Sequence, residues 1–360
     1  MKIIDPYGSE LVKDYTKIIK DFGLDSQSHK LLPNPNKLLR RGVVFASRGL
    51  KDIIKAIKQK KRFYVLSGIM PTGKKIHFGN RMVVENIKYF QDHGGEAYIL
   101  VADLEAVAAR GVDLKQAKKN ALEFHIPVYI ALGLDPKKTY FYFQSENKEV
   151  TDLAFEAAKK VTENEFRAIY GNVEPGRVMS AFEQVGDILY PQLKEPMPGV
   201  IPVGIDQDPH IRLTRDIAKR LKEKYKFFPP AGLYHKYTPS LDGSLKMSKS
   251  KPESLIELPE EPASVCRKLR RALSGGRDTL EEHRRLGAIV EKDVCFEILK
   301  QHLIEDDKEL DKIYQSYKSG KMTSGELKEI TCKKITEFMN NLNKGIVKAR
   351  KNIKNLKFIK

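Results

Sequence analysis

The sequence is short of cysteine and of long apolar runs. Its 360 residues include three cysteines, Cys266, Cys295 and Cys332, which lie far apart and form no Cys-x-x-Cys pair. Such spacing disfavours both a zinc site and the disulfide framework of a small secreted domain. No apolar run approaches the roughly 18 residues of a membrane-spanning helix. The first ten residues, MKIIDPYGSE, lack the apolar stretch of a signal peptide. These absences predict a cytoplasmic protein with reduced thiols, no bound metal and no membrane association.

Acidic residues are also in short supply. Asp and Glu number 47 against 65 Lys and Arg, which leaves a formal net charge of +18 and a pI near 9.5. This surplus favours a polyanionic partner, nucleic acid first, although a lysine-rich surface would give the same composition. Hydrophobic residues make up 41% of the chain, enough for a buried core. At about 150 residues per domain, the length predicts two or three domains.

What the chain does contain is a series of apolar strands separated by helices. FYVLSGI (63–69) and AYILVAD (97–103) are buried-strand patterns, with a turn and a helix (81–94) between them. A strand, a glycine-containing loop, a helix and a second strand form a βαβ unit, whose parallel sheet binds its ligand at the carboxyl ends of the strands. Further strands are predicted over 139–143 and 199–205.

Three segments differ in this pattern. The first, 1–61, is mixed and polar, and the second, 62–262, holds the strands together with a helical insertion around 148–195. After about residue 262 the strand signal ends, and 263–360 has the pattern of helices. The sequence therefore predicts an α/β fold, with a parallel-sheet domain followed by an α-helical domain. Within the last segment, helices are predicted over 263–273, 281–303, 306–318 and 323–357.

Two loops are candidates for binding phosphate groups, and the first follows the strand at 63–69. Gly68 to Lys74 matches the G-x-x-x-x-G-K pattern of a P-loop. The next residue is Lys75, where a P-loop needs a Ser or Thr hydroxyl for Mg²⁺, and Pro71 removes a backbone N–H from the cradle. A P-loop is therefore disfavoured.

The same loop continues into a different arrangement, His77-Phe78-Gly79-Asn80, here called the first signature. His77 and Asn80 stand at the start of a helix, where they can face an anion, and Gly79 lets a base or a ribose approach the backbone. A capping or surface role for His77 is the alternative.

The second candidate is the pentapeptide KMSKS, here called the lysine signature, formed by Lys246, Met247, Ser248, Lys249 and Ser250. Two lysines three residues apart on a polar loop can bind the oxygens of a leaving polyphosphate. A solvated loop is the alternative in so basic a chain, but this pentapeptide arises by chance in roughly one such chain in several thousand.

Together, the two loops resemble the paired signatures of class I aminoacyl-tRNA synthetases. Longer stretches resemble the tryptophanyl-tRNA synthetase family of the archaeal and eukaryotic kind, from about residue 37 to 345. These stretches are LLRRGVVFASRG (38–49), GIDQDPHIRLTRDIA (204–218), SGGRDTLEEHRRLGA (274–288) and SGKMTSGELKE (319–329). The resemblance implies a Rossmann-like catalytic domain, an α-helical anticodon-binding domain over 263–360, a homodimer, ATP with Mg²⁺, and tRNA(Trp) as a partner.

The reaction that the resemblance implies is the ATP-dependent activation of L-tryptophan to tryptophanyl-adenylate, followed by transfer to the 3′ end of the tRNA. Activation needs no general base, because the substrate carboxylate is already a nucleophile. It needs positioning, and cations where charge builds on the phosphates. The resemblance gives this catalytic role to His77, Lys246 and Lys249.

Other ATP contacts follow from the same resemblance. Gly204 would let the adenosine approach, and Asp206 would hold the ribose hydroxyls or the region of the substrate ammonium group. Asn80 stands where the first signature usually has a second His. The full set of implied ATP-binding residues is Gly79, Asn80, Gly204, Asp206, Lys246, Met247, Ser248, Lys249 and Ser250.

The resemblance also implies a tryptophan pocket lined by Glu105, Gln184 and Gln207. For each of these residues, and for Asp206, a structural hydrogen bond is the alternative. Asp187 matches the Asp with which bacterial tryptophan enzymes accept the indole N–H. For Asp187 the alternative is a helix residue paired with a nearby Arg or Lys.

The wall of this pocket departs from the eukaryotic pattern. Leu66 and Leu100 stand where many eukaryotic enzymes use a Tyr and a Gln to recognise indole. The predicted pocket is therefore closer to the bacterial one, on an otherwise archaeal or eukaryotic frame.

Two basic segments, RKLRR (267–271) and the tail 348–360, could contact RNA phosphates, with a solvated helix face and a frayed tail as the alternatives. Three other functions stay open. A P-loop kinase or ATPase is disfavoured by Lys75, and a noncatalytic RNA-binding relative would tolerate decay of the lysine signature. A tyrosyl-tRNA synthetase would differ in amino-acid selectivity.

Overall fold

The chain divides into two units in the computed structural model, which describes residues 14–247 and 251–359. The sheet unit consists of Met1–Lys74, Val83–Lys236 and Arg350–Lys360, and the helical unit consists of Lys75–Met82 and Tyr237–Ala349. The chain passes between them at four points, two of which lie inside helices, α4 (Asn80–Asp92) and α17 (Ser324–Lys351). Residues 75–82 thus belong to the helical unit and residues 350–360 to the sheet unit, unlike their neighbours in sequence. The functional division at residues 61 and 262 stays a prediction.

The sheet unit is built on a seven-stranded sheet in the order β1-β7-β6-β2-β4-β5-β9. Neighbouring strands are parallel except for the antiparallel pair β1 and β7, so the predicted α/β fold with a mostly parallel sheet is confirmed. The strand bounds are Val44–Arg48 for β1, Tyr64–Ile69 for β2, Glu96–Val101 for β4, Thr139–Phe143 for β5, Gly199–Gly204 for β6, Ala231–His235 for β7 and Lys357–Phe358 for β9.

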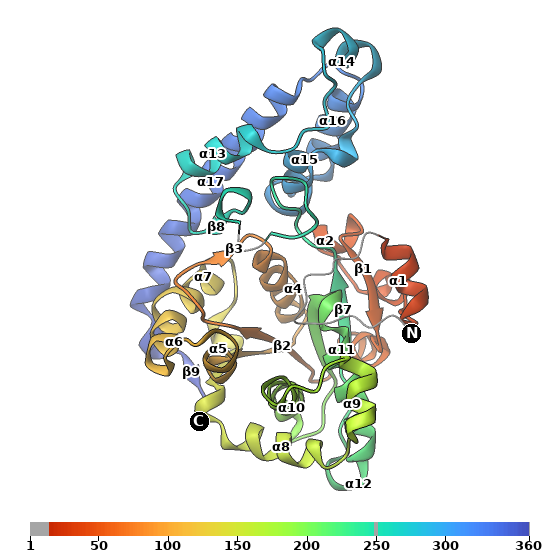
Figure 1. Ribbon diagram of the computed structural model, residues 1–360, viewed down its shortest axis with the longest axis vertical. Helices are drawn as coiled ribbons and strands as arrows, with labels where there is room; N and C mark the ends of the chain where they lie inside the picture. The colour runs from red at the N-terminus through yellow and green to blue at the C-terminus, as the bar shows by residue number, and fades with distance from the viewer. Residues whose placement is uncertain (1–13, 248–250, 360) are drawn as a thin grey trace. The chain divides into compact units, whose positions relative to one another are not determined.

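Helices connect these strands, and α8 and α10 lie beside each other (Figure 1). A π-helical segment, Ala121–His125, lies between α6 and α7. The remaining helix bounds are Tyr15–Asp21 for α1, Lys37–Arg40 for α2, Lys51–Gln59 for α3, Asp103–Arg110 for α5, Leu114–Asn120 for α6, Ile126–Ala131 for α7, Lys148–Ala158 for α8, Glu163–Tyr170 for α9, Pro175–Leu189 for α10, Asp208–Arg220 for α11 and Lys222–Tyr225 for α12.

The prediction that strands end after about residue 262 is wrong at the C-terminal tail. Residues 357–358 form β9, which pairs in parallel with β5. The Ile359 N–H donates to the Phe141 carbonyl at 2.7 Å, and the Phe358 ring stacks on the Phe143 ring with centroids 5.7 Å apart. The tail thus covers an otherwise open sheet edge with a short strand and an aromatic contact. It is therefore not frayed.

The helical unit contains a two-stranded antiparallel sheet, β3 (Ile76–His77) with β8 (Glu257–Leu258), and five helices in its described residues from 237 to 349. The prediction of one continuous helix over 281–303 is wrong. The chain breaks at Gly287, whose φ of +69° suits glycine and where a Cβ would lie 1.8 Å from the Lys318 carbonyl oxygen. The helices are α13 Pro262–Arg271, α14 Leu280–Leu286, α15 Val294–Ile298, α16 Asp307–Lys318 and α17, with a π-helical turn at Leu299–Leu303.

Helices of both units carry buried apolar side chains. Within the described residues, no helix combines the length and the hydropathy needed to cross a membrane.

Candidate active site

One face of the sheet gathers the side chains that the sequence predicts around the amino acid. The strand register pairs Gly68 with Leu100 and Leu100 with Tyr142, so these residues lie side by side on one face, which also carries Leu66. Leu66 and Leu100 are buried and share one hydrophobic cluster with Tyr142 and with residues of α10. The predicted apolar wall is therefore present, and α10 covers it.

Asp187 projects from α10 into this cluster and is fully buried. The Tyr142 hydroxyl donates to its Oδ1 at 2.9 Å, and the Gln144 amide donates to its Oδ2 at 2.7 Å. Burial raises the pKa of Asp187 well above its ordinary value, and the nearby Glu183 carboxylate adds to the effect. Within the described residues no Arg or Lys pairs with Asp187, so the alternative of a helix ion pair is wrong.

The backbone around Asp187 is fixed from two sides. The Tyr64 hydroxyl donates to the Ile188 carbonyl at 2.6 Å, which ties α10 to strand β2. On the other side, a Cβ at Gly186 would lie 2.4 Å from the Val150 carbonyl oxygen, so only glycine permits α8 to pack this closely. Asp187 is held firmly where β2 and α8 meet α10.

Two of the predicted pocket residues lie close to Asp187. Glu105 is on α5, where burial raises its pKa and a hydrogen bond with Ser180 opposes that shift. Ser180, Gln184 and Asp187 occupy positions i, i+4 and i+7 of α10, which places them on one stripe of the helix. The structure therefore brings Glu105, Gln184 and Asp187 to one side of the sheet unit.

Sequence reasoning missed Tyr142 and Gln144, the two donors to Asp187. Both lie at the carboxyl end of β5, in the stretch TYFYFQ. The rule that ligands bind at the carboxyl ends of parallel strands could have pointed to them.

The turn after β6 carries Gly204, Asp206 and Gln207, which occupy the strand end and a 3-10 turn, Ile205–Gln207. Asp206 and Gln207 are half-buried, as access to a ligand requires. The structure thus places all three at the carboxyl end of a parallel strand.

The buried His210 follows this turn on α11. Its Nδ1 lies 2.9 Å from the Tyr170 hydroxyl. Burial lowers the pKa of His210 to about 3, against the opposing charge of Asp206, so this ring stays neutral.

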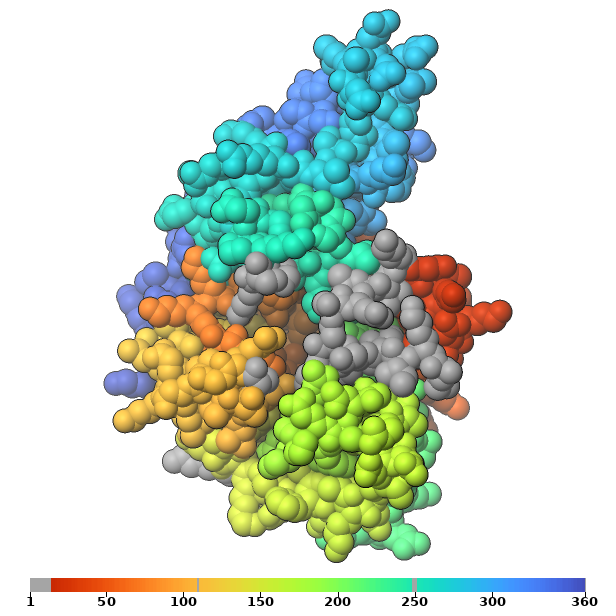
Figure 2. All heavy atoms as spheres, viewed as in Figure 1, coloured from red at the N-terminus to blue at the C-terminus, as the bar shows by residue number. Residues whose placement is uncertain are grey.

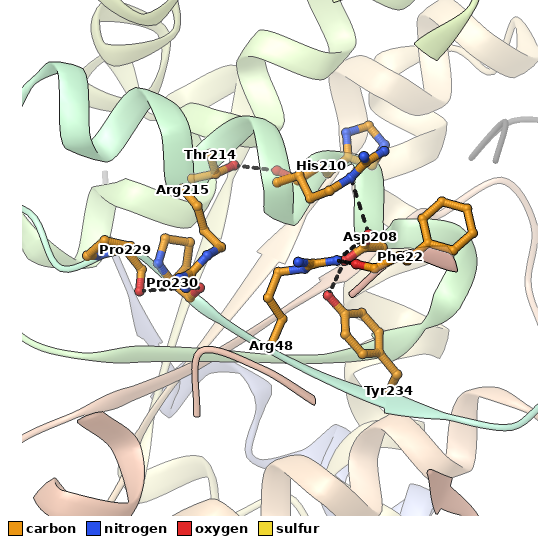
Figure 3. A network of polar contacts seen from close by, with 10 residues as sticks. Phe22, Arg48, Asp208, His210, Thr214, Arg215, Pro229, Pro230 and Tyr234 are labelled. Atoms are coloured by element: carbon orange, nitrogen blue, oxygen red, sulfur yellow. Dashed lines mark hydrogen bonds and ion pairs between the residues drawn. The ribbon is translucent and has the colours of Figure 1, made fainter. Parts of the chain in front are cut away.

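Asp208 anchors the same turn through a buried ionic network (Figure 3). Arg48 of β1 donates to it through Nε at 2.8 Å and through Nη2 at 3.0 Å, and the Tyr234 hydroxyl of β7 donates at 2.5 Å. Arg212 adds a second cation, with Nε 3.3 Å from Oδ2. Arg48 also donates to the Phe22 carbonyl at 2.8 Å, so the network fastens the N-terminal part of the sheet unit to the turn.

The first signature lies in the helical unit, at the end of β3 and the start of α4. The His77 N–H donates to the Asn80 side-chain oxygen at 3.2 Å, so Asn80 caps the turn that leads into the helix. A Cβ at Gly79 would lie 3.0 Å from the His77 ring. Gly79 therefore makes room for the His77 ring itself, a local reason for glycine that the sequence did not reveal.

The lysine signature begins in the same unit, on a loop closed at its base. Leu241 N–H and the Ser240 hydroxyl both donate to the Ser254 carbonyl at 2.8 Å. Met247 is buried, and the Lys246 ammonium lies 5.2 Å from the centre of the Tyr237 ring. The predicted residues Ser248, Lys249 and Ser250 lie outside the described residues.

Lys75 forms an ion pair with Glu257 at 2.7 Å. The residue that breaks the P-loop pattern is thus engaged in an exposed ion pair.

The basic segment 267–271 is partly neutralised. Lys268 pairs with Glu260 at 2.8 Å and Arg270 pairs with Glu329 at 3.1 Å, whereas Arg267 and Arg271 are exposed.

A mostly parallel α/β sheet with polar side chains at its strand ends, and a helical unit that carries both phosphate signatures, define a class I aminoacyl-tRNA synthetase. Residues 58–340 match the family described as tRNA synthetases class I (W and Y), and the chain belongs to this family.

Curated relatives cover almost the whole chain. It is 44% identical to the Tryptophan--tRNA ligase of Methanocaldococcus jannaschii, over 95% of each chain, and 40% identical to that of Aeropyrum pernix, over 96% of this chain and 95% of the relative. Among solved structures, tryptophanyl-tRNA synthetase from Aeropyrum pernix superposes with a TM-score of 0.90 at 39% identity and 99% coverage of both chains. That from Encephalitozoon cuniculi bound to tryptophan gives 0.86 at 28% identity, covering 97% of this chain and 98% of the other.

Proposed function

We propose that this chain activates L-tryptophan with ATP to form tryptophanyl-adenylate and transfers the tryptophanyl group to the 3′ end of tRNA(Trp). The observation that carries the amino-acid assignment is Asp187, a fully buried carboxylate that receives hydrogen bonds from neutral donors only and lies beside the apolar wall of Leu66 and Leu100. The relatives named Tryptophan--tRNA ligase support the same assignment.

Asp187 has acceptor capacity left for an indole N–H. An ionised carboxylate offers about four lone-pair sites, and Tyr142 and Gln144 use one each. Leu66 and Leu100 offer no polar partner to the hydroxyl oxygen of a tyrosine, which would then lose a hydrogen bond on binding. The pocket therefore favours tryptophan over tyrosine.

The other polar residues of the sheet unit would hold the remainder of the substrates. Glu105, Gln184 and Gln207 line the amino-acid side, where the raised pKa of Glu105 reflects a buried site that a substrate ammonium group would complement. Asp206 would hold the ribose hydroxyls or the ammonium region, and Gly204 would let the adenosine approach its backbone.

Activation is a displacement at the α-phosphorus of ATP. The tryptophan carboxylate attacks, pyrophosphate leaves, and His77, Lys246 and Lys249 stabilise the charge that builds on the phosphate oxygens. Gly79, Asn80, Met247, Ser248 and Ser250 complete the proposed ATP contacts. Among the described residues, no group of three or more His, Cys, Asp or Glu side chains could hold a metal ion. Mg²⁺ is expected with the phosphates of ATP, which supply the oxygen ligands that this cation prefers.

The proposed homodimer has support in α8 and α10. Phe155 on α8 and Met179 on α10 are each 71% exposed, and the part of the chain that holds these helices covers a broad area of the face in Figure 2. Large exposed apolar side chains on adjacent helices are typical of an interface. Light scattering should report about 82 kDa, twice the 41.1 kDa of one chain. The proposed location of this enzyme is the cytoplasm. A fully active 41 kDa species would contradict the dimer.

Residues 263–360 are the proposed anticodon-binding domain. Arg267 and Arg271 are exposed on α13 and are available for phosphate contacts, in contrast to Lys268 and Arg270, which are paired.

The decisive test is ATP–pyrophosphate exchange with each of the twenty amino acids. Tryptophan-dependent exchange is expected, and Lys249→Ala should lower its rate by roughly 10²-fold with little change in tryptophan affinity, because the lysine acts mainly in the transition state. Exchange with tyrosine alone would make the chain a tyrosyl-tRNA synthetase. Binding of tRNA without any exchange would make it a noncatalytic RNA-binding protein.

A further inference from the structure

Thr238 lies beside both phosphate signatures although it belongs to neither. Its carbonyl oxygen accepts a hydrogen bond from the Met247 N–H at 3.4 Å, at the start of the lysine signature. Its hydroxyl oxygen lies 3.9 Å from the place that a Cβ on Gly79 would occupy, and 4.0 Å from the Met82 sulfur on the first turns of α4. The side chain is buried. One residue thus links the two segments that are proposed to bind ATP.

His302 holds Thr238 from the C-terminal part of the helical unit. It lies on the π-helical turn Leu299–Leu303, a type of turn that is frequent at functional sites, and it is fully buried. Its Nε2 is 2.9 Å from the Thr238 hydroxyl oxygen. A hydroxyl and an imidazole can each donate or accept, so this pair fixes the rotamers of both side chains.

The His302 ring also packs on the first signature itself. Its centroid lies 4.3 Å from that of Phe78, a fully buried residue of that signature. On another side, Phe338 of α17 meets the Phe78 ring edge-on at 5.6 Å, and the Arg81 guanidinium lies 4.3 Å from the centre of the Phe338 ring. The first signature is therefore packed against two aromatic side chains from the C-terminal helices.

We propose that Thr238 and His302 are positioning residues that hold the first signature and the lysine signature in register for ATP, and this inference rests on the proposed function. The two side chains touch neither ATP nor tryptophan in this account. Loss of the hydroxyl or of the imidazole would free the Thr238 residue to shift, and its carbonyl, which accepts from the Met247 N–H, would shift with it relative to Gly79. The effect should fall on ATP use, since Asp187 and Leu66 belong to the sheet unit.

The test compares Thr238→Val, which removes the hydroxyl at constant shape, with Thr238→Ser, which keeps it. Thr238→Val should raise the KM for ATP or lower kcat in ATP–pyrophosphate exchange by tenfold or more, with the KM for tryptophan within twofold of the unaltered protein. Thr238→Ser should recover most of the activity. His302→Phe should match Thr238→Val, and the double variant should be no worse than either single one, because the two residues act as a pair.

Thr331→Val is the matched control. Thr331 is a buried threonine of the same unit whose hydroxyl donates to the Leu327 carbonyl at 2.8 Å, inside α17. If Thr238→Val and Thr331→Val give the same exchange kinetics, the positioning role is overturned. A wild-type protein without exchange for any amino acid would instead refute the proposed function. In that case, calorimetric titration with ATP still decides the inference, because Thr238→Val should weaken ATP binding and Thr331→Val should not.

Discussion

Two buried aspartates on neighbouring helices of the sheet unit have the same setting and different partners. Asp187 on α10 accepts from the Tyr142 hydroxyl of β5, and Asp208 on α11 accepts from the Tyr234 hydroxyl of β7. The strand registers place both tyrosines on one face of the sheet. The difference is charge: Arg48 and Arg212 compensate Asp208, whereas Gln144, a neutral amide, completes the shell of Asp187.

This difference separates a structural carboxylate from one that is available to a ligand. The hydrogen bonds of Arg48 to Asp208 outweigh the burial that would lower the pKa of the arginine, and they raise it above its ordinary value. Asp187 has no such cation within the described residues, and burial raises its pKa. An uncompensated buried carboxylate costs stability, so its presence beside a predicted pocket points to a role in binding.

The largest effect is expected from Asp208→Asn. Removing the charge takes the buried counter-charge of Asp208 away from two half-buried arginines, Arg48 and Arg212, and breaking such a pair typically costs about 3–5 kcal/mol. Denaturant-induced unfolding of the wild type and the variant measures this loss. A change below about 1 kcal/mol would show that the network contributes little and would remove the contrast with Asp187.

The next largest effect is expected from Asp187→Ala, and it concerns binding rather than folding. The KM for tryptophan in ATP–pyrophosphate exchange should rise by roughly 10²-fold, equivalent to about 2.7 kcal/mol, because the indole N–H loses its acceptor. Near-normal tryptophan affinity together with a loss of thermal stability would mean that Asp187 is structural.

A pH series on Asp187→Asn sharpens the comparison. The folded pKa of Asp187 is raised above the ordinary value of 3.8, so the protonated carboxyl favours folding at low pH. That contribution is lost as the pH rises through the raised pKa, at up to about 1.4 kcal/mol per pH unit. The amide variant does not titrate, and its unfolding free energy should therefore gain on the wild type as the pH rises above 3.8 towards the raised pKa. A difference that stays constant at every pH above 3.8 contradicts the raised pKa.

The two tyrosines should have smaller effects on stability than Asp208→Asn. Tyr234→Phe removes a donor to the carboxylate paired with two arginines and should cost about 1.5–3 kcal/mol of unfolding free energy, the range for hydrogen bonds to charged groups. Tyr142→Phe should cost about 1 kcal/mol, because protonation of Asp187 can offset the lost donor. Equal losses would mean that the two carboxylates do not differ in charge.

Local sequence patterns predicted much of this molecule. The apolar runs that became β2, β4, β5 and β6 are long and continuous, and both signatures are contiguous stretches of the chain. Strands β7 and β9 were not predicted, since β7 follows a proline pair and β9 has only two residues.

The partners of the key side chains could not be predicted, because they come from distant parts of the chain. Arg48 and Asp208 are 160 residues apart, and Thr238 and His302 are 64 apart. Resemblance pointed to Asp187 but could not supply Tyr142 and Gln144, whose positions depend on how α10 packs on the sheet. No periodicity within a helix or a strand encodes such pairs.

The hydrogen bond from indole to Asp187 can be measured directly with an analogue of tryptophan in which sulfur replaces the indole N–H, as in benzothienylalanine. Calorimetric titration should show that the unaltered protein binds tryptophan at least about tenfold more tightly than the analogue, since the analogue leaves a buried acceptor unpaired. Asp187→Ala should bind the two nearly equally. If both proteins show the same preference for tryptophan, Asp187 does not accept the indole N–H, and the distinction between the two buried aspartates does not mark the substrate site.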